Sequence, residues 1–197
     1  DYSITFLPAS TTLNLKLYIE GYYDTVTSEM QPVKANQGIG SSITDVDDIT
    51  VELRNATTFA LVATTNAILK TNGTATCTFN TSYTGSYYIA VKHRSAVETW
   101  SNGSVLFSTN PVSYDFSNAA NKAFGNNMLQ VETGIWALFN GDTNQDTLID
   151  TQDYTSWESD YLNSVFGYTA NDLNGDGLVD TQDYTIWESN YLLSVFS

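Results

Sequence analysis

Apolar and polar residues alternate along several short stretches before residue 140. Leu13, Leu15, Leu17 and Ile19 occupy every second position, and Ile49, Val51 and Leu53 repeat the pattern. A period of two is typical of a strand with one buried face. The same criterion predicts strands over 59–64, 67–70, 74–79, 87–93, 105–107 and 112–116, a helical turn over 118–124, and turns at Asn72-Gly73 and Thr84-Gly85.

Seven or more short strands separated by turns predict an immunoglobulin-like, antiparallel β-sandwich over residues 1–140. A jelly roll is the alternative. Cys77, the single cysteine, lies in the alternating run 75–79. We therefore expect it to be a small buried side chain, with no disulfide framework.

Beyond residue 140 the apolar spacing becomes helical. The residues concerned are Tyr154, Trp157, Tyr161, Leu162 and Val165, and the same types recur at Tyr184, Trp187, Tyr191, Leu192 and Val195. Residues 141–167 and 171–197 are identical at about two-thirds of their positions. Each repeat predicts one helix, and Gly167 is the expected stop of the first. The chain is therefore mostly β with a small α module, divided into domains 1–140 and 141–197.

A loop rich in oxygen-bearing side chains precedes each predicted helix. Calcium takes six to eight oxygen ligands, and a chain curling around the ion offers them at loop positions 1, 3, 5, 9 and 12, with a backbone carbonyl at position 7. The expected ligands are Asp142, Asn144, Asp146, Leu148, Asp150 and Asp153, then Asp172, Asn174, Asp176, Leu178, Asp180 and Asp183. Two aligned copies of this set predict two calcium ions. Ile149 and Val179, apolar residues at position 8, are expected to pack the loops back to back.

The two loops differ at position 6, where the sharp turn favours glycine. The second loop has Gly177 there, whereas the first has the β-branched Thr147. We expect strain of about 1–3 kcal/mol at Thr147 and weaker calcium binding by the first loop. Residues 141–197 hold eleven acidic residues and no Lys or Arg. Two calcium ions would reduce this charge from −11 to −7, so the segment is expected to fold only with metal.

Residues 141–197 resemble a dockerin module, in which two calcium loops with Asp at position 12 each lead into a helix. The resemblance implies that loop positions 10 and 11 contact a cohesin partner; these are Thr151-Gln152 and Thr181-Gln182. Typical dockerins often have Ser/Thr pairs there and basic residues on the following helix. This sequence departs from that pattern, with Gln at position 11 and no basic residue in the module.

The β-domain resembles secreted and surface proteins of Bacteroidetes-type bacteria. The resemblance lies in Gly85-Ser-Tyr-Tyr-Ile-Ala-Val-Lys-His-Arg94 and Val112-Ser-Tyr-Asp-Phe116, ahead of the dockerin-like repeats. It implies an extracellular or cell-surface location and implies no reaction. Asp24-Thr25-Val26 is similar to sites that such bacteria O-glycosylate, which makes Thr25 a candidate glycosylation site.

The net charge of −15 excludes the basic surfaces on which nucleic-acid binding depends. No apolar run reaches the roughly 18–20 residues of a membrane span. High calcium availability suits an extracellular setting.

We expect no enzymatic activity, because no catalytic motif is recognisable. His93, the single histidine, lies in a predicted strand and is expected to point away from Lys92 and Arg94. Asp45, Asp47 and Asp48 are expected to form a solvated loop. The alternatives for this cluster are a glycosidase-like carboxylate pair and a third calcium site.

Both ends of the chain are apolar, at Tyr2, Ile4 and Phe6 and at 191–196. An N-terminal strand that pairs with a neighbouring subunit would build a head-to-tail homo-polymer. Our leading hypothesis is a calcium-binding structural subunit of an extracellular fibre or surface layer. The alternative is an adaptor that docks on a cohesin-like partner and binds glycan through aromatic residues, the candidates being Tyr22, Tyr23, Tyr83, Tyr87, Tyr88 and Trp100.

Overall fold

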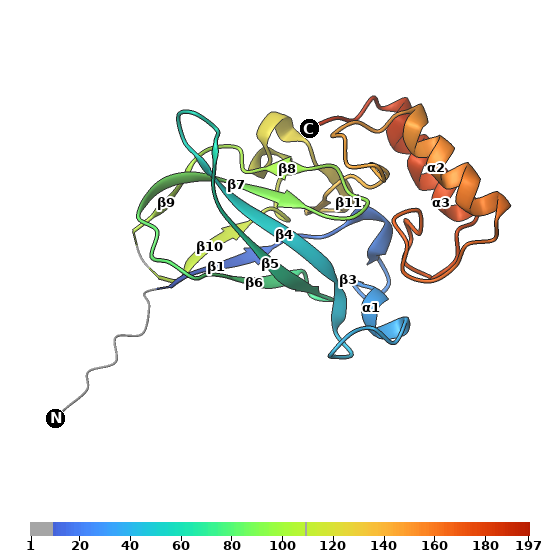
Figure 1. Ribbon diagram of the computed structural model, residues 1–197, viewed down its shortest axis with the longest axis horizontal. Coiled ribbons are helices and arrows are strands. Elements are labelled where there is room, and N and C mark those ends of the chain that lie inside the picture. Colours follow the sequence, from blue (N-terminus) through green and yellow to red (C-terminus); the bar gives the residue numbers. More distant parts are fainter. Residues whose placement is uncertain (1–9, 109) are drawn as a thin grey trace.

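The smaller of the two main sheets, which has three strands, is built around strand β1 (Thr11–Lys16), in a computed structural model that describes residues 10–108 and 110–197 (Figure 1). Side chains of β1 alternate between buried and half-buried, as the sequence predicted. The strand pairs antiparallel with β6 (Thr74–Phe79) and parallel with β10 (Val112–Asp115). The prediction of a wholly antiparallel sandwich is therefore wrong for one pair. No hairpin links β1 to β10, so chain connectivity leaves their relative direction open.

The larger sheet has the order β5-β4-β7-β8, and β9 also pairs with β7. Its strands are β4 (Asp45–Asn55), β5 (Leu61–Lys70), β7 (Gly85–Lys92), β8 (Thr99–Trp100) and β9 (Val105–Phe107). The two strands predicted over 59–64 and 67–70 are one strand, β5. Phe59 lies instead in the β4–β5 turn at φ 59°, and the Asn55 side chain caps that turn by accepting the N–H groups of Thr57 and Thr58.

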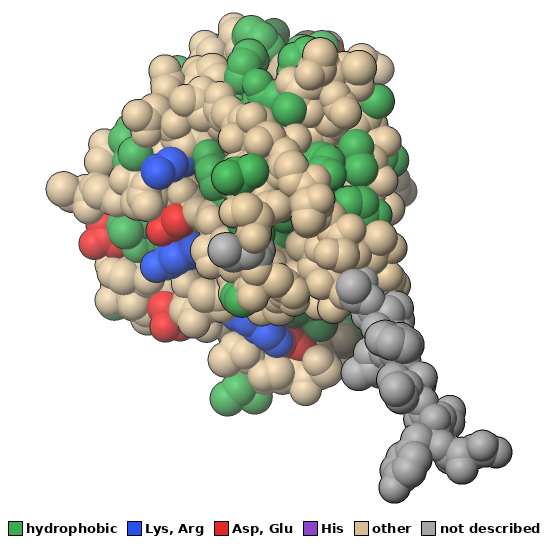
Figure 2. Space-filling view, turned by 90° about the vertical axis from the view of Figure 1, so that its left-hand side faces the viewer, with side chains coloured by type: hydrophobic (Ala, Val, Ile, Leu, Met, Phe, Trp, Pro, Cys, Tyr) green, Lys and Arg blue, Asp and Glu red, His purple; other side chains and the backbone are tan. Residues whose placement is uncertain are grey.

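The inner faces of the two sheets enclose one apolar core. Leu13, Val51, Leu53, Ile89 and Phe116 are fully buried in it. Cys77 belongs to the same core, and burial raises the pKa of its thiol to about 12. The prediction that Cys77 is a buried small side chain is confirmed. Figure 2 shows the end of the sandwich far from the helices, where charged side chains are few and most of the surface is uncharged.

Several elements are too short to show a repeating pattern of apolar residues, so they could not be predicted from the sequence. They are β2 (Tyr23–Asp24), β3 (Glu29–Met30), α1 (Val33–Asn36), β11 (Leu129–Glu132) and β12 (Ile135–Ala137). The helical turn predicted over 118–124 is observed as two 3-10 turns, Ala120–Lys122 and Phe124–Asn126. A third 3-10 turn spans Glu20–Tyr22 and leads into β2.

Helices α2 (Thr151–Leu162) and α3 (Thr181–Leu192) follow the two acidic loops. Asp150 and Asp180 are their N-caps, and each forms a capping box with the Asp three residues later. Helix α2 ends before Gly167, contrary to the predicted stop. Asn163 caps it, and Ser164 then takes a positive φ of 53°, which turns the chain earlier than expected. None of the helices described is long and apolar enough to cross a membrane.

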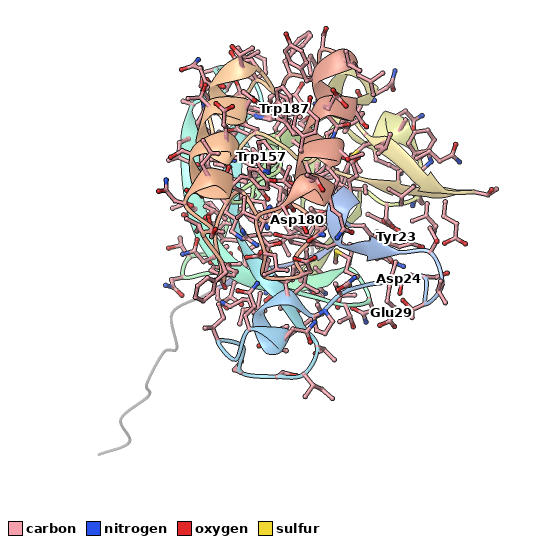
Figure 3. The ribbon with its side chains drawn as sticks, turned by 90° about the vertical axis from the view of Figure 1, so that its right-hand side faces the viewer. Tyr23, Asp24, Glu29, Trp157, Asp180 and Trp187 are labelled. Atoms are coloured by element: carbon pink, nitrogen blue, oxygen red, sulfur yellow. The ribbon has the colours of Figure 1, made fainter. Side chains whose placement is uncertain are left out.

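Ile149 lies in a buried apolar cluster with Trp187 and Val195 that does not include Val179, so the predicted back-to-back packing of Ile149 and Val179 is not observed. Leu148 forms a bridge with Phe196, and Leu178 forms one with Phe166, so each loop pairs with the chain that follows the opposite helix. Trp157 of α2 and Trp187 of α3 each contact the loop of the other repeat in the same way. Trp157 Nε1 donates to the Asp180 carbonyl at 3.1 Å, and Trp187 Nε1 donates to the Asp150 carbonyl at 3.1 Å (Figure 3). The repeats therefore interlock as one module.

The polymer hypothesis depends on the two apolar ends of the chain. Tyr2, Ile4 and Phe6 lie outside the described residues, so an exchanged N-terminal strand stays a prediction. At the other end, Val195 is buried, and Asn127 Nδ2 donates to the Phe196 carbonyl at 2.9 Å. Ser197 N donates to the Thr147 carbonyl at 2.9 Å. The backbone of the C-terminal end is therefore held by its own chain (Figure 1), but Leu192, Leu193 and Phe196 are exposed, so a role of this end in contacts between subunits stays a prediction.

Candidate metal-binding module

Two aspartates lie inside the first loop, at positions 1 and 12. Asp142 accepts the backbone N–H groups of Asp146 and Thr147, both at 3.1 Å. Asp153 Oδ1 accepts those of Thr143 at 2.7 Å and Asn144 at 3.2 Å. Both side chains are buried. Backbone amides therefore fix the two carboxylates from opposite ends of the loop.

The second loop repeats this geometry closely. Asp172 accepts the N–H groups of Gly175 at 2.9 Å and Gly177 at 3.0 Å. Asp183 Oδ1 accepts those of Leu173 at 2.6 Å and Asn174 at 3.0 Å. Three of the four bonds match those of the first loop, and the fourth comes from position 4, Gly175, rather than from position 5, Asp146.

Burial of these four carboxylates disfavours their charged forms. Burial, together with the neighbouring charge of Asp153, raises the pKa of Asp142 to about 7. Burial likewise raises the pKa of Asp183 to about 6 and shifts the pKa values of Asp153 and Asp172 upward. The module has no Lys or Arg to compensate them. A hard divalent cation among these oxygens would remove the penalty, and oxygen donors of this kind are those that calcium prefers.

The other predicted calcium ligands make their contacts away from these buried aspartate pairs. Asn144 Nδ2 donates to Asp146 Oδ2 at 3.0 Å, and Asn174 with Asp176 repeats the contact at 3.0 Å. Asp150 and Asp180 face their helix N-termini as caps. Leu148 and Leu178, predicted to offer carbonyl oxygens, have exposed side chains. Within residues 10–108 and 110–197, no three His, Cys, Asp or Glu side chains converge closely enough to hold a metal ion.

Both loops take the left-handed backbone that the sequence argument required at position 6. Thr147 has φ 78° and Gly177 has φ 86°. Position 4 is also left-handed, with φ 62° at Gln145 and 77° at Gly175. Sequence reasoning missed position 4, although the glycine in the second loop was a signal. The first loop thus places two non-glycine residues in a region that glycine prefers.

The second loop lies against the β-domain with no spare room. A Cβ atom added to Gly175 would lie 2.3 Å from Val33 Cγ2, and one added to Gly21 would lie 2.0 Å from the Leu173 carbonyl oxygen. Asn140 Nδ2 donates to that same carbonyl at 2.7 Å. The backbones of the two domains are therefore in direct contact.

Glu20 forms a second link between the domains. Its Oε2 accepts Asn190 Nδ2 at 2.6 Å and Asn140 N at 3.1 Å. Burial raises the pKa of Glu20 to about 7, and the two hydrogen bonds partly offset that rise. Helix α3 is thus attached to the turn that precedes β2.

A buried ion cluster centred on Asp47 extends this contact. Arg94 Nε donates to Asp47 Oδ2 at 3.0 Å, and His93 Nε2 lies 3.1 Å from the same oxygen. Tyr168, just before the second loop, donates its hydroxyl to Asp47 Oδ1. Burial opposes ionisation of Asp47, but the charges of His93 and Arg94 outweigh it and hold its pKa well below the usual range. The cluster ties strand β4 to the helical module.

This cluster corrects two predictions from the sequence. Asp45 and Asp47 are fully buried and partnered by Lys70 and Arg94, while only Asp48 is exposed, beside Lys34. The solvated loop is therefore wrong for two of the three residues, and their cationic partners disfavour a third calcium ion. His93 does not point away from Arg94, because β7 ends at Lys92 and the alternation of a strand stops there.

We expect Asp47→Asn to destabilise the chain by about 3 kcal/mol at pH 7, because it leaves the Arg94 charge buried without its partner. The pKa of Asp47 is lower in the folded chain than the value of about 3.9 in unfolded chains. Its contribution is therefore complete above about pH 4 and lost as the pH falls further. Urea unfolding from pH 7 to pH 2.5 should show the stability gap between the two proteins closing below pH 4. A gap independent of pH would contradict the ion-pair explanation.

The candidate sugar-stacking residues do not form one platform. Tyr22 is fully buried, and Tyr83 and Tyr87 pack against Phe79 and Phe107 of the core. Tyr23 pairs with Tyr18. Only Tyr88 and Trp100 share a site, an open cavity of about 660 Å³ between the β-domain and the C-terminal end. Their rings are tilted by 55°, and Phe59, one of four Phe residues that also line the cavity, is tilted by 46° to Tyr88. Phe59, Tyr88 and Trp100 therefore meet at angles rather than in one plane, and we call the surface they form the aromatic slot.

Thr25 lies in the exposed turn between β2 and β3. Asp24 Oδ1 accepts the Val26 N–H at 2.8 Å, which fixes the turn. Figure 3 shows Tyr23, Asp24 and Glu29 on this hairpin, to the side of the two module helices. Glycosylation of Thr25 stays a prediction.

No protein-family model and no curated protein matches the sequence. The chain is similar to a crystal structure described as the Coh3ScaB-XDoc_M1ScaA complex, an N-terminal interface mutant of a type II cohesin–X-dockerin complex from Acetivibrio cellulolyticus. The TM-score is 0.52 at 14% identity, over 91% of this chain and 94% of that one. The C-terminal interface mutant of the same complex gives a TM-score of 0.48 at 15% identity.

The likeness is one of fold. It supports a mostly β chain built on a sandwich, of the kind found in cohesin–dockerin complexes. Partner, location and metal content are matters for the proposal that follows.

Proposed function

We propose that this chain is a non-enzymatic, extracellular docking protein whose helical module binds two calcium ions and presents its helices to a cohesin-like partner. The observation that carries the proposal is the buried carboxylate pair in each loop. Asp142 with Asp153, and Asp172 with Asp183, are held by backbone amides in a module without Lys or Arg, and of the four only Asp172 feels a cationic side chain of the β-domain, Arg94. Burying such groups is costly unless a cation joins them.

Calcium is expected to draw the remaining oxygens inward. Asp146 and Asp176 lie on the exposed rims of the loops, where each accepts a hydrogen bond from an Asn side chain and one from a Leu backbone N–H, and an ion is expected to replace the Asn contact. The carbonyl groups of Leu148 and Leu178 complete the expected set. Metal binding would stabilise the folded module, because coordination to the cation would replace the repulsion between the carboxylates of each loop.

The outer faces of the helices offer a surface for a partner. Thr151, Gln152, Thr181 and Gln182 are exposed at the start of the two helices, and Leu162 and Leu192 are exposed at their ends. Exposed Leu residues beside polar ones are typical of a docking surface. A basic or neutral partner surface suits this module, since its own charge is strongly negative.

The aromatic slot favours a second binding role for the β-domain. Phe59, Tyr88 and Trp100 line a cavity of about 660 Å³, within the size range of small-ligand sites. A single sugar ring against the aromatic residues of this cavity is the ligand that we propose for it. This glycan role is independent of docking by the helices.

Docking is tested by biolayer interferometry against the type II cohesin named in the matching structure and a panel of other cohesins. We expect binding in calcium and loss of binding in EGTA. Replacing Gln152 and Gln182 together by Arg should change affinity at least tenfold, because both lie on the exposed docking surface. Gln130→Arg, on exposed strand β11, is the matched control. Absence of binding to every cohesin in calcium would reject the docking role.

A further inference from the structure

The second acidic loop receives a hydrogen bond from the β-domain at its first predicted ligand. Gln37, directly after α1, donates through Nε2 to Asp172 Oδ2 at 3.1 Å. Asp172 is fully buried, and its Oδ2 also accepts Gly177 N at 3.0 Å. The same oxygen is thus held from within the loop and from the other domain.

The first loop shows a different arrangement. The hydrogen bonds to Asp142 come from Asp146 N and Thr147 N, both within its own loop. The side chain that approaches from position 4, Gln145, donates to the carbonyl oxygens of Asp142 and Ala96 rather than to a carboxylate. The two loops share most of their internal hydrogen bonds and differ in what the β-domain contributes to the first carboxylate.

The side chain of Gln37 lies against the second loop. Its Oε1 is buried with no hydrogen-bond partner among the described residues. Its amide lies under 4 Å from the position where Gly177 would carry a Cβ atom. On the opposite side, Gly175 lies against Val33 of α1 and the Tyr22 ring. The element α1 therefore fixes both the loop backbone and its first carboxylate.

The charges around Asp172 favour a neutral donor. Arg94 stacks on the Tyr168 ring at 4.4 Å, close to the loop, but its charge is paired with Asp47. A glutamine amide orients the carboxylate without adding a positive charge that would repel a metal ion. Outer-shell partners of this kind typically change metal affinity by about 10–100-fold.

We propose that the β-domain completes the second calcium site, with Gln37 as a positioning residue that holds Asp172, so that calcium at this site ties the module to the sandwich. This inference rests on the calcium binding proposed above. It makes the second site the tighter of the two and makes its affinity depend on a residue more than a hundred positions away in the chain.

The test is isothermal titration calorimetry of the intact chain with calcium alone. Gln37→Ala should weaken one of two sites by about tenfold or more and leave the other unchanged. The same loss should appear for the single site that remains in an Asp142→Asn background, which assigns it to the second loop. Asn36→Ala, an exposed neighbour, is the matched control and should bind as the wild type does. Far-UV circular dichroism in saturating calcium confirms that each variant folds.

Three results would overturn the inference. Two sites of unchanged affinity in Gln37→Ala would remove the role of Gln37 and leave the proposed function standing. Equal weakening of both sites would indicate a general loss of stability rather than positioning. A wild-type chain that binds no calcium would reject the inference and the proposed function together.

Discussion

Removal of calcium with EGTA is expected to abolish the helical signal of residues 141–197 and to lower the thermal midpoint of the whole chain. The charges of four buried carboxylates and seven other acidic residues then repel one another without a cation to offset them. At free calcium about a thousand times its dissociation constant, each site contributes about 4 kcal/mol to folding. Two sites together match the entire stability of many small domains, so this is the largest effect that we expect.

Far-UV circular dichroism and hydrogen exchange measure the two parts separately. The helical signal reports α2 and α3, while amide protection in β1, β4 and β7 reports the sandwich. We expect the helices to be lost first and sandwich protection to fall in part. Glu158→Gln removes one acidic charge outside the predicted ligand sets and should behave as the wild type does. A helical signal that persists in EGTA would contradict a metal-dependent fold.

Gly21→Ala is expected to destabilise the chain by about 3 kcal/mol. The added methyl group would lie 2.0 Å from the backbone oxygen of Leu173, and 3.1 Å from Asn140 Nδ2. Backbone cannot rotate aside, so the domains must separate or the 3-10 turn must shift. The Asn140–Leu173 hydrogen bond and the Glu20–Asn190 hydrogen bond are lost with that separation.

Urea unfolding in saturating calcium measures this effect. Gly103→Ala is the control, because an added Cβ atom there meets no other heavy atom within 4 Å. It should change stability by less than about 0.5 kcal/mol. If Gly21→Ala were equally neutral, the close contact between the 3-10 turn and the second loop would not exist in solution.

The pattern of neighbouring residues was sufficient to predict those elements whose limits are set locally. Strands β6 and β9 have the predicted bounds, because alternation over 74–79 and 105–107 coincides with one buried face. The helices follow the acidic loops because Asp150 and Asp180 cap them locally. The positive φ at Thr147 followed from the turn that the loop spacing requires.

Contacts between distant residues were beyond the same reasoning. Asp47 looked solvated because its cationic partners, His93 and Arg94, are remote in sequence and a strand pattern does not reveal them. The pairing of Leu148 with Phe196 depends on how two repeats interlock, which the repeat sequence alone leaves open. Gln37 carried no motif at all. Its role emerges only where α1 meets the second loop.

The central claim is that this chain binds two calcium ions through its paired loops. Native mass spectrometry of the intact protein, after dialysis against calcium and with magnesium as the competing ion, counts them directly. We expect two bound calcium ions in the wild type, one in Asp142→Asn and one in Asp172→Asn. A wild-type mass without bound calcium, or an unchanged count in both variants, would contradict the claim.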